Sequence, residues 1–304
     1  MNFLSMKYFI ALSEEKSFTR AAERLHITQQ TLSAHMAGLE KEVGMKLFVR
    51  HVPLELTDGG EVFYRYARIF QRNELALRRE LSDVSGSESG ILRIGVAPAR
   101  GQVLLPPSIE IFHQRYPHVK VLLSEMANEA IWNALKRDEI DLAIARVTGE
   151  IPGMVYETYT REEIVLVMAD SLWQQLMLSA PPSIDWKEPL TELPPFMAQC
   201  PFLINSEEDI AGALARHLFQ RAAFEPHVMV ESENMNTMLA LCARGLGAYF
   251  CPRNLAEAMI PKEKRKELHM ISLREGSYDI SFGYQKKAHR WSMIGNFIQL
   301  MKRG

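Results

Sequence analysis

Residues 17–42 constrain the fold of this chain more than any other stretch, because they contain two short amphipathic helical patterns. In the first pattern the apolar residues recur at i, i+3, i+4 and i+7, as Phe18, Ala21, Ala22 and Leu25. In the second they keep a helical spacing, as Leu32, Met36, Leu39 and Val43. Ser17 and Thr28 stand where N-caps belong, and small residues in the first helix would let the second cross it closely. The stretch predicts a helix-turn-helix whose second helix enters the DNA major groove.

The outward face of the second predicted helix is uncharged, polar at its N-terminal end and small further along. Amide and hydroxyl side chains at such a helix start can hydrogen-bond base edges. We expect base readout from Gln29, Gln30, Thr31 and Ser33. Ala34 and Gly38 leave little side chain beyond them, which concentrates recognition at the helix start and in the segment that follows. A surface helix of an ordinary three-helix bundle would look the same, so the pattern alone leaves both interpretations open.

The next segment favours DNA binding, because it predicts the wing of a winged helix. Residues 44–50 begin with a glycine that ends the helix and continue as a short extended piece. Residues 51–57 follow as a second strand, with a proline that suits a sheet edge or a turn. Lys46, Arg50 and His51 would then lie where they can contact the phosphates of the DNA backbone.

At this point the chain strongly resembles the LysR-type transcriptional regulators. The matching residues are Phe9, Ser17 to Ala22, Leu25, Thr28 to Gln30, Leu32, Ser33, Leu39, Glu40, Gly44, Leu47, Phe48, Arg50, Leu56, Thr57 and Gly60. The resemblance implies a winged helix-turn-helix over residues 1–58 that binds double-stranded DNA. It implies DNA contacts from Ser17, Thr19, Arg20, Thr28, Gln29, Gln30, Thr31, Ser33, Ala34, His35, Arg50 and His51.

A long helical pattern follows from Thr57 to about Val84. A helix of roughly 40 Å, at about 1.5 Å per residue, cannot bury its apolar stripe inside a small winged domain. An equivalent helix of a second subunit is the simplest partner. The resemblance likewise makes residues 59–84 a linker helix that pairs two subunits, and it implies a homotetramer and RNA polymerase as a further partner. Residues 85–90 are a flexible hinge by composition.

From residue 91 strands alternate with helices, which is typical of an α/β fold. We expect strands at 91–96, 119–124, 142–145, 202–204, 227–231, 247–251, 268–273 and 280–285. We expect helices at 102–116, 128–137, 207–222, 234–244 and 291–301, with Pro106 and Pro107 in the first turns of the first helix. The stretch from Pro117 to Val121 is echoed from Pro226 to Val230, which indicates two similar lobes with a cleft between them.

Such a lobe pair resembles the periplasmic solute-binding fold, which LysR-type regulators use as an effector sensor. The fold class expected for the chain is therefore α+β: a winged helix-turn-helix, a long linker helix and a two-lobed α/β, periplasmic-binding-protein-like effector domain at 91–304. Lobe I would comprise 91–161 and 269–304, and lobe II 162–268. The chain would cross between them near Arg161 to Glu163 and return near His269.

Open α/β sheets bind ligands beyond the carboxyl ends of their strands, beside helix N-termini. The loops there predict an effector site formed by Pro98, Ala99, Arg100, Gln102, Asn128, Arg146, Asn205 and Ser232. Because arginine can hold a carboxylate bidentately, a small carboxylate would suit Arg100 and Arg146. Surface or interlobe salt bridges explain these two arginines equally well.

Composition narrows the remaining functions. The net charge of −2 means that any positive field for DNA must be local, and three cysteines indicate a reducing compartment without a disulfide framework. A buried hydrophobe explains Cys200 more simply than a redox-sensing thiol. The chain shows no phosphate loop, GxSxG turn or zinc-ligand spacing, so we expect no enzyme activity, cofactor or metal.

Two classes of function fit these features. The first is a sequence-specific transcriptional regulator that responds to a small-molecule effector bound between two lobes. The second is a cytoplasmic solute-binding module that carries an interaction domain. No apolar run approaches membrane-spanning length and no signal peptide is recognisable, which favours a cytoplasmic protein. Together with the winged-helix pattern, this favours the regulator.

Overall fold

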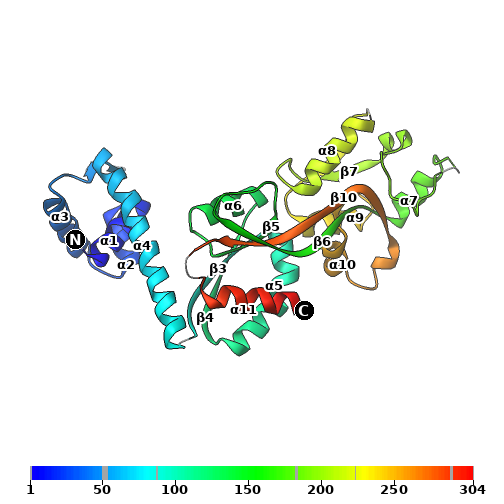
Figure 1. The fold of residues 1–304 in the computed structure, drawn as a ribbon. Coiled ribbons are helices and arrows are strands. Elements are labelled where there is room, and N and C mark those ends of the chain that lie inside the picture. Colours follow the sequence, from blue (N-terminus) through cyan, green and yellow to red (C-terminus); the bar gives the residue numbers. More distant parts are fainter. Residues whose placement is uncertain are drawn as a thin grey trace. The chain divides into compact units, whose positions relative to one another are not determined.

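The computed structural model describes residues 2–49, 54–86, 88–181, 184–222, 224–287 and 290–303. The chain divides into two compact units, Met1–Ser87 and Glu88–Gly304 (Figure 1). The boundary between the units falls inside the segment predicted as a hinge. Among the described residues, no helix is both long enough and apolar enough to cross a membrane.

The N-terminal unit is built from four helices and a two-stranded ribbon. Helices α1 (Phe3–Glu15), α2 (Phe18–Leu25) and α3 (Gln29–Val43) enclose a small core that includes Phe9, Leu12 and Leu32. Strands β1 (Phe48–Val49) and β2 (Glu55–Leu56) pair in antiparallel fashion. The predicted caps are confirmed, because Ser17 accepts from the Arg20 N–H and Thr28 from the Thr31 N–H. Gly44 ends α3 with a φ of 79°, a left-handed conformation that favours glycine.

Glu40 holds α3 and the wing in one arrangement. Its carboxylate, only 5% exposed, accepts from the N–H of Leu47 at 2.9 Å and of Phe48 at 3.4 Å. The ammonium of Lys46 pairs with the other carboxylate oxygen at 2.9 Å. Burial alone would raise the pKa of Glu40, but these bonds outweigh burial and leave that pKa lowered. The base of the wing is thus anchored through a carboxylate of the helix before it.

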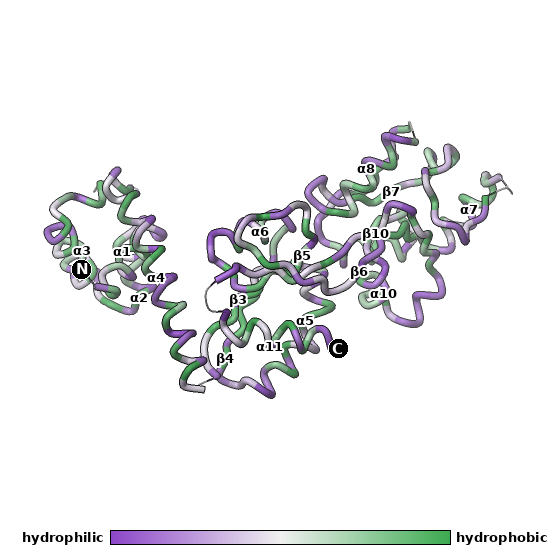
Figure 2. Tube along the Cα trace, viewed as in Figure 1, coloured by the Kyte–Doolittle hydropathy of each residue, from purple (hydrophilic) through white to green (hydrophobic). Residues whose placement is uncertain are grey.

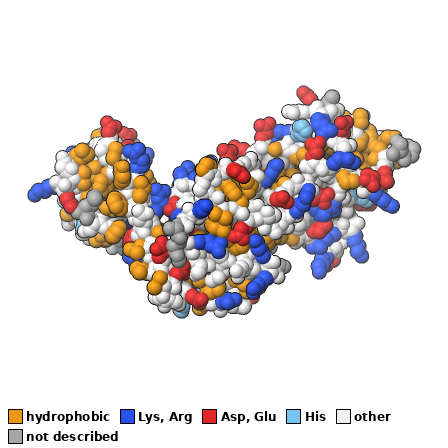
Figure 3. Space-filling view, viewed as in Figure 1, with side chains coloured by type: hydrophobic (Ala, Val, Ile, Leu, Met, Phe, Trp, Pro, Cys, Tyr) orange, Lys and Arg blue, Asp and Glu red, His pale blue; other side chains and the backbone are white. Residues whose placement is uncertain are grey.

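Helix α4 (Asp58–Ser85) begins where Thr57 accepts a hydrogen bond from the Gly60 N–H. Its first turns pack on the small core, where Ala67 is buried. Hydrophobic residues recur along the trace of α4 (Figure 2), and hydrophobic side chains are visible on the surface of this unit (Figure 3). The exposed apolar side chains of α4 include Val62, Tyr66, Phe70, Leu77 and Leu81. The apolar stripe that the sequence predicted is therefore present and largely uncovered within one chain.

The C-terminal unit contains one mixed eight-stranded sheet in the order β4-β3-β5-β10-β6-β9-β7-β8. Parallel strands β3 (Ser89–Val96), β4 (His118–Glu125) and β5 (Leu142–Arg146) form one end of it. Parallel strands β7 (Pro201–Ile204), β8 (His227–Glu231) and β9 (Ala248–Pro252) form the other. The antiparallel pair β6 (Met154–Ala169) and β10 (Leu268–Gln285) runs between the two ends as neighbouring long ribbons (Figure 1).

Three local expectations differ from this structure. The strands expected at 268–273 and 280–285 are one strand, β10, with a register shift between Ser272 and Ser277. The hinge expected at 85–90 is shorter, because α4 continues to Ser85 and β3 begins at Ser89. Pro106 and Pro107 lie inside α5 (Pro98–Arg115), because this helix begins before the predicted residue 102. The predicted α+β class and two-lobed architecture are otherwise confirmed.

The remaining helices flank the sheet (Figure 1). They are α6 (Asn128–Lys136), α7 (Asp170–Met177), α8 (Ile210–Ala222), α9 (Met235–Cys242), α10 (Arg253–Met259) and α11 (Ser292–Arg303), with 3-10 turns η1 (Pro195–Gln199) and η2 (Arg265–Glu267). The C-terminal α11 returns to lobe I, where Phe297 meets Phe112 of α5 with ring centroids 5.2 Å apart. Lobe I is therefore completed by the end of the chain.

Candidate functional site

The outward face of α3 presents the residues that were predicted to contact DNA. Gln29, Gln30, Thr31 and Ala34 are exposed, whereas Ser33 and His35 are half-buried. The His35 ring packs edge-on against Tyr8, with centroids 4.9 Å apart. Gln30 has no hydrogen bond to any other described residue, so it is the long polar side chain of this face that is most open to a ligand.

Other residues predicted to contact DNA form hydrogen bonds within the N-terminal unit. The hydroxyls of Thr28 and Thr31 are 2.8 Å apart, and Thr19 donates to Gln29 Oε1 at 3.3 Å. The Arg20 guanidinium donates to the carbonyl oxygen of Glu15. The Thr19–Gln29 bond therefore links α2 to the start of α3, and the Arg20 bond links α2 to the end of α1. Arg50 and His51, the predicted wing contacts, lie outside the described residues.

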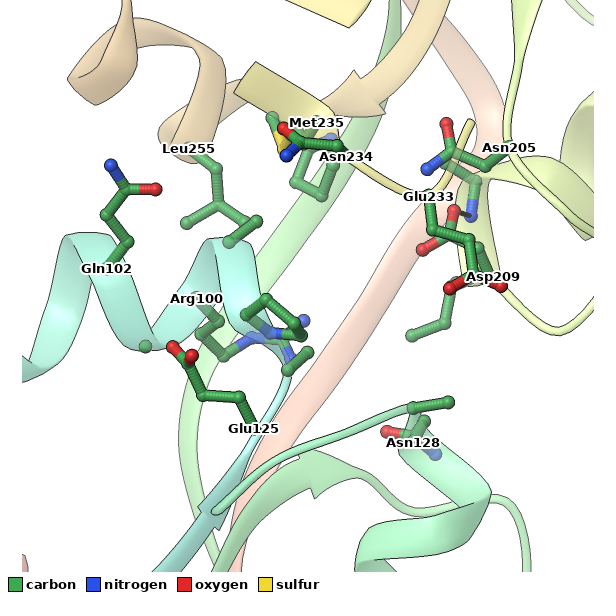
Figure 4. A pocket seen from close by; sticks show the side chains of 18 of the residues that line it. Arg100, Gln102, Glu125, Asn128, Asn205, Asp209, Glu233, Asn234, Met235 and Leu255 are labelled. Carbon is green, nitrogen blue, oxygen red and sulfur yellow. Dashed lines mark hydrogen bonds between the residues drawn. The ribbon is translucent and has the colours of Figure 1, made fainter. Parts of the chain in front are cut away.

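A pocket of about 780 Å³ opens in the C-terminal unit, beside the carboxyl ends of strands from both lobes. This volume is in the range of small-molecule sites. Lobe I contributes residues around the starts of α5 and α6, and lobe II contributes residues around the starts of α8 and α9 (Figure 4). Gln102 of α5 and Asn236 of α9 meet across the lobes, with the Asn236 Nδ2 donating to Gln102 Oε1 at 2.7 Å.

Most predicted effector residues line this pocket: Pro98, Ala99, Arg100, Gln102, Asn128 and Asn205. Arg146 and Ser232 are not among the described residues that line it. The Arg146 backbone is bonded by the Asn128 carboxamide, and its guanidinium lies 5.6 Å from the centroid of the Tyr278 ring. Ser232 instead accepts from the N–H of Asn234 at 3.1 Å.

Arg100 lines the pocket, but its charge is already paired. The guanidinium is buried and binds Glu162 bidentately, at 3.0 and 2.9 Å. The Tyr278 hydroxyl donates to the same carboxylate at 2.6 Å. Burial would raise the pKa of Glu162, but these partners keep it lowered, so the carboxylate is ionised beside Arg100. The guanidinium is therefore engaged in a buried salt bridge, which supports the interlobe salt-bridge interpretation of this arginine over an effector contact.

Sequence reasoning missed the acidic residues of the pocket wall, which are Glu125, Glu208, Asp209 and Glu233. Asp209 Oδ1 accepts from the N–H groups of Ala211 and Gly212, at 2.9 and 3.0 Å, and so caps α8. Burial raises the pKa of Asp209, with a contribution from nearby Glu233 that Arg100 opposes. These acidic residues follow predicted strands or lie at the starts of predicted helices, so their positions in the sequence indicated that they could line the pocket.

Cys200 is buried, and desolvation raises the pKa of its thiol to about 11. A thiol with so high a pKa is largely protonated at neutral pH and hence a poor nucleophile. This favours the interpretation of Cys200 as a small core residue. Among the described residues, no group of three or more His, Cys, Asp or Glu side chains is placed to hold a metal ion.

Comparisons with known proteins match both units. Residues 3–61 match the family described as bacterial regulatory helix-turn-helix protein, lysR family, and residues 85–304 match the LysR substrate binding domain. The regulator AlsR of Bacillus subtilis (strain 168) is 27% identical over 99% of this chain and 95% of its own length. A probable RuBisCO transcriptional regulator of Gracilaria tenuistipitata var. liui is 31% identical over 79% of this chain and 76% of its own length.

Solved structures agree on the fold. The LysR family regulator CbnR has a TM-score of 0.63 and 21% identity, with 100% of this chain and 99% of that protein covered. The same scores hold for full-length CbnR in complex with its target DNA.

Proposed function

This chain belongs to the LysR family of bacterial transcriptional regulators. We propose that it recognises its operator through α3 and responds to an effector bound in the interlobe pocket. Members of this family are DNA-binding regulators with an effector-binding domain, and they are not enzymes. The chain is thus a DNA-binding transcriptional regulator. The alternative of a solute-binding module with an unrelated interaction domain does not account for the helix-turn-helix match.

The observation that carries the proposed DNA contact is the open polar start of α3. Gln29, Gln30 and Thr31 are exposed there, and the Thr28 cap holds this helix start in place. Amide side chains at this position can make paired hydrogen bonds to adenine in the major groove. We assign base readout to Gln29, Gln30, Thr31 and Ser33, with Arg50 and His51 on phosphates.

Selection of binding sites from random duplex DNA tests this assignment. Gln30→Ala should change the preferred half-site, whereas Gln71→Ala, the same replacement on α4, should leave it unchanged. A uniform loss of affinity for all sequences in Gln30→Ala would show that Gln30 contacts the backbone and not the bases. Failure of the wild-type chain to select any sequence at low salt would overturn the operator proposal itself.

The effector site is proposed for the pocket because residues of both lobes converge there on a cavity of suitable volume. A ligand that contacts both lobes favours one arrangement of them, which is the differential binding that an allosteric response requires. The predicted carboxylate effector has lost its support, since Arg100 is paired and Arg146 stands outside the lining.

The exposed stripe of α4 supports a homodimer through this helix. Val62, Tyr66, Leu77 and Leu81 are about half exposed in one chain, which is unfavourable for apolar side chains repeated along one helix. Leu77→Glu combined with Leu81→Glu should convert dimers to monomers in light scattering. Leu178→Glu, at an even more exposed leucine of the C-terminal unit, should not. The homotetramer, the contact with RNA polymerase and the cytoplasmic location remain parts of this proposal.

A further inference from the structure

The interlobe pocket has an unbalanced charge that indicates the chemistry of its ligand. Its only cation among the described lining residues is Arg100, and Glu162 already neutralises that cation. The wall also carries four carboxylates, those of Glu125, Glu208, Asp209 and Glu233. An anionic ligand would therefore approach net negative charge in a partly desolvated site, where charges interact more strongly than in water.

A second observation lies on the lobe II wall, at Asn205. The residue is 5% exposed and lines the pocket. Its Oδ1 is the single buried side-chain nitrogen or oxygen without a hydrogen-bond partner in the part of the chain that the structure describes. Asn205 directly follows β7, and Figure 4 shows it in the same part of the pocket wall as Glu233 and Asp209. A buried acceptor without a donor is unfavourable, so this atom favours a ligand that donates.

Two carboxylates of the same wall are acceptors as well. Asp209 uses Oδ1 to cap α8, which leaves Oδ2 without a bond to any described residue. Glu233 accepts only a long hydrogen bond, 3.4 Å, from the Ser206 hydroxyl. A protonated amine brings three donors and the complementary charge to such a cluster.

Two other occupants fit less well. Within the described ranges no three carboxylates are placed to share a metal ion, and a cavity of about 780 Å³ is far larger than an ion needs. Helix N-termini attract anions, but Asp209 already caps α8 and Asn234 caps α9 through the Thr237 N–H. Two N–H groups at the start of α8 and one at the start of α9 are thus already bonded.

We infer that the effector of this regulator carries a protonated amine, bound on the lobe II wall by Asp209, Glu233 and the Asn205 side-chain oxygen. The inference rests on the proposed function, since it takes the interlobe pocket to be the effector site. It names the chemical class of the ligand that the family membership leaves open.

Calorimetry and thermal unfolding of the full chain test the inference with three series of probes. These are linear α,ω-diamines, diols and dicarboxylates of matched length, from propane to heptane. At neutral pH at least one diamine should bind and raise the melting temperature. The diol and dicarboxylate of the same length should bind more weakly by about tenfold or more, since charge-assisted hydrogen bonds are lost.

Variants of the acidic residues test where the diamine binds. Asp209→Asn retains the cap of α8, because asparagine caps helices as well as aspartate, and should weaken the diamine about tenfold. Glu233→Gln should act in the same direction. Glu207→Gln is the matched control, because Glu207 is adjacent in sequence but does not line the pocket and is mostly exposed beside Arg216. It should leave diamine affinity unchanged.

The outcomes separate this inference from the proposed function. If a dicarboxylate or a diol binds more tightly than its matched diamine, and Asn205→Ala abolishes that binding, the pocket remains the effector site and the amine is refuted. Binding of no diamine to a chain that still selects DNA likewise refutes the amine but retains the regulator. Equal diamine loss in Glu207→Gln would show non-specific attraction to acidic surface, which also refutes the inference.

Discussion

Each of the two units contains a buried carboxylate that organises a functional surface, but the two carboxylates are held differently. Glu40 of the N-terminal unit binds groups six to eight residues away in sequence, at Lys46, Leu47 and Phe48. Glu162 of the C-terminal unit binds Arg100 and Tyr278, which are 62 and 116 residues away. The first anchors a local motif and the second joins lobe I, the interlobe strand pair and the pocket wall.

The difference predicts where each unit is vulnerable. Glu40 is fixed by two backbone N–H groups, and its charged partner Lys46 is 70% exposed on its side chain. Glu162 depends on a cation that is buried as deeply as itself, with side-chain exposures of 4% and 0%. Loss of the cation therefore leaves an isolated buried charge in the C-terminal unit. In the N-terminal unit it leaves a buried carboxylate that two backbone N–H groups still bind.

The largest effect is expected for Arg100→Met. This change leaves Glu162 buried without its cation and should lower the free energy of unfolding of the C-terminal unit by about 3–5 kcal/mol. All four tryptophans lie in this unit, so fluorescence during urea unfolding reports on it alone. The double variant Arg100→Met with Glu162→Gln should recover part of the loss. A double variant as unstable as the single one would contradict the role given to the unpaired charge.

Glu40→Ala should have the next largest effect, in the other unit. It removes the acceptor for two buried N–H groups at the base of the wing, at a cost of about 1–3 kcal/mol. Operator affinity should fall because the wing loses its attachment to α3. Tryptophan-monitored unfolding should stay as in the wild type, since the change lies in the unit without tryptophan. A matching shift of the fluorescence transition would mean that the units unfold together.

Lys46→Ala separates the contribution of the ion pair from that of the backbone N–H groups, because it removes the charged partner of Glu40 and leaves the backbone donors. Since the lysine is mostly exposed, the stability of the N-terminal unit should change by only about 0–1 kcal/mol. Helical circular dichroism during thermal unfolding measures it. An effect as large as that of Glu40→Ala would place the anchor in the ion pair and not in the N–H groups.

Asp209→Asn should have the smallest effect, with the opposite sign at neutral pH. Burial raises the folded-state pKa of Asp209, so the folded state prefers the protonated acid. That preference stabilises the fold below the unfolded pKa, about 3.9, and is lost as the pH rises through the higher folded pKa. The asparagine variant should therefore match or exceed the wild type in stability at pH 7 and lose this advantage near pH 4. Lower stability at pH 7 would show that the ionised form is needed for folding.

The local features of the N-terminal unit were predictable from the residues alone. Ser17, Thr28 and Gly44 end or begin helices through contacts within a few positions, and the spacing of Leu32, Met36 and Leu39 determines which face is buried. The face of α3 left for DNA follows from these choices, because a helix has a fixed period. The contact of the His35 ring with Tyr8 could not be predicted from the helical period, since it depends on how α1 packs.

In the pocket, the sequence predicted the loops but not the electrostatics. It determined that strand ends and helix starts such as those at Pro98, Asn128 and Asn205 would line a cleft, because α/β connections place them at one edge of the sheet. Only the tertiary structure decided that Arg100 pairs with Glu162 and that Asp209 and Glu233 line the same pocket. Spacing along a chain does not reveal which distant charge a buried group will meet, because desolvation makes that pairing a property of the packed core.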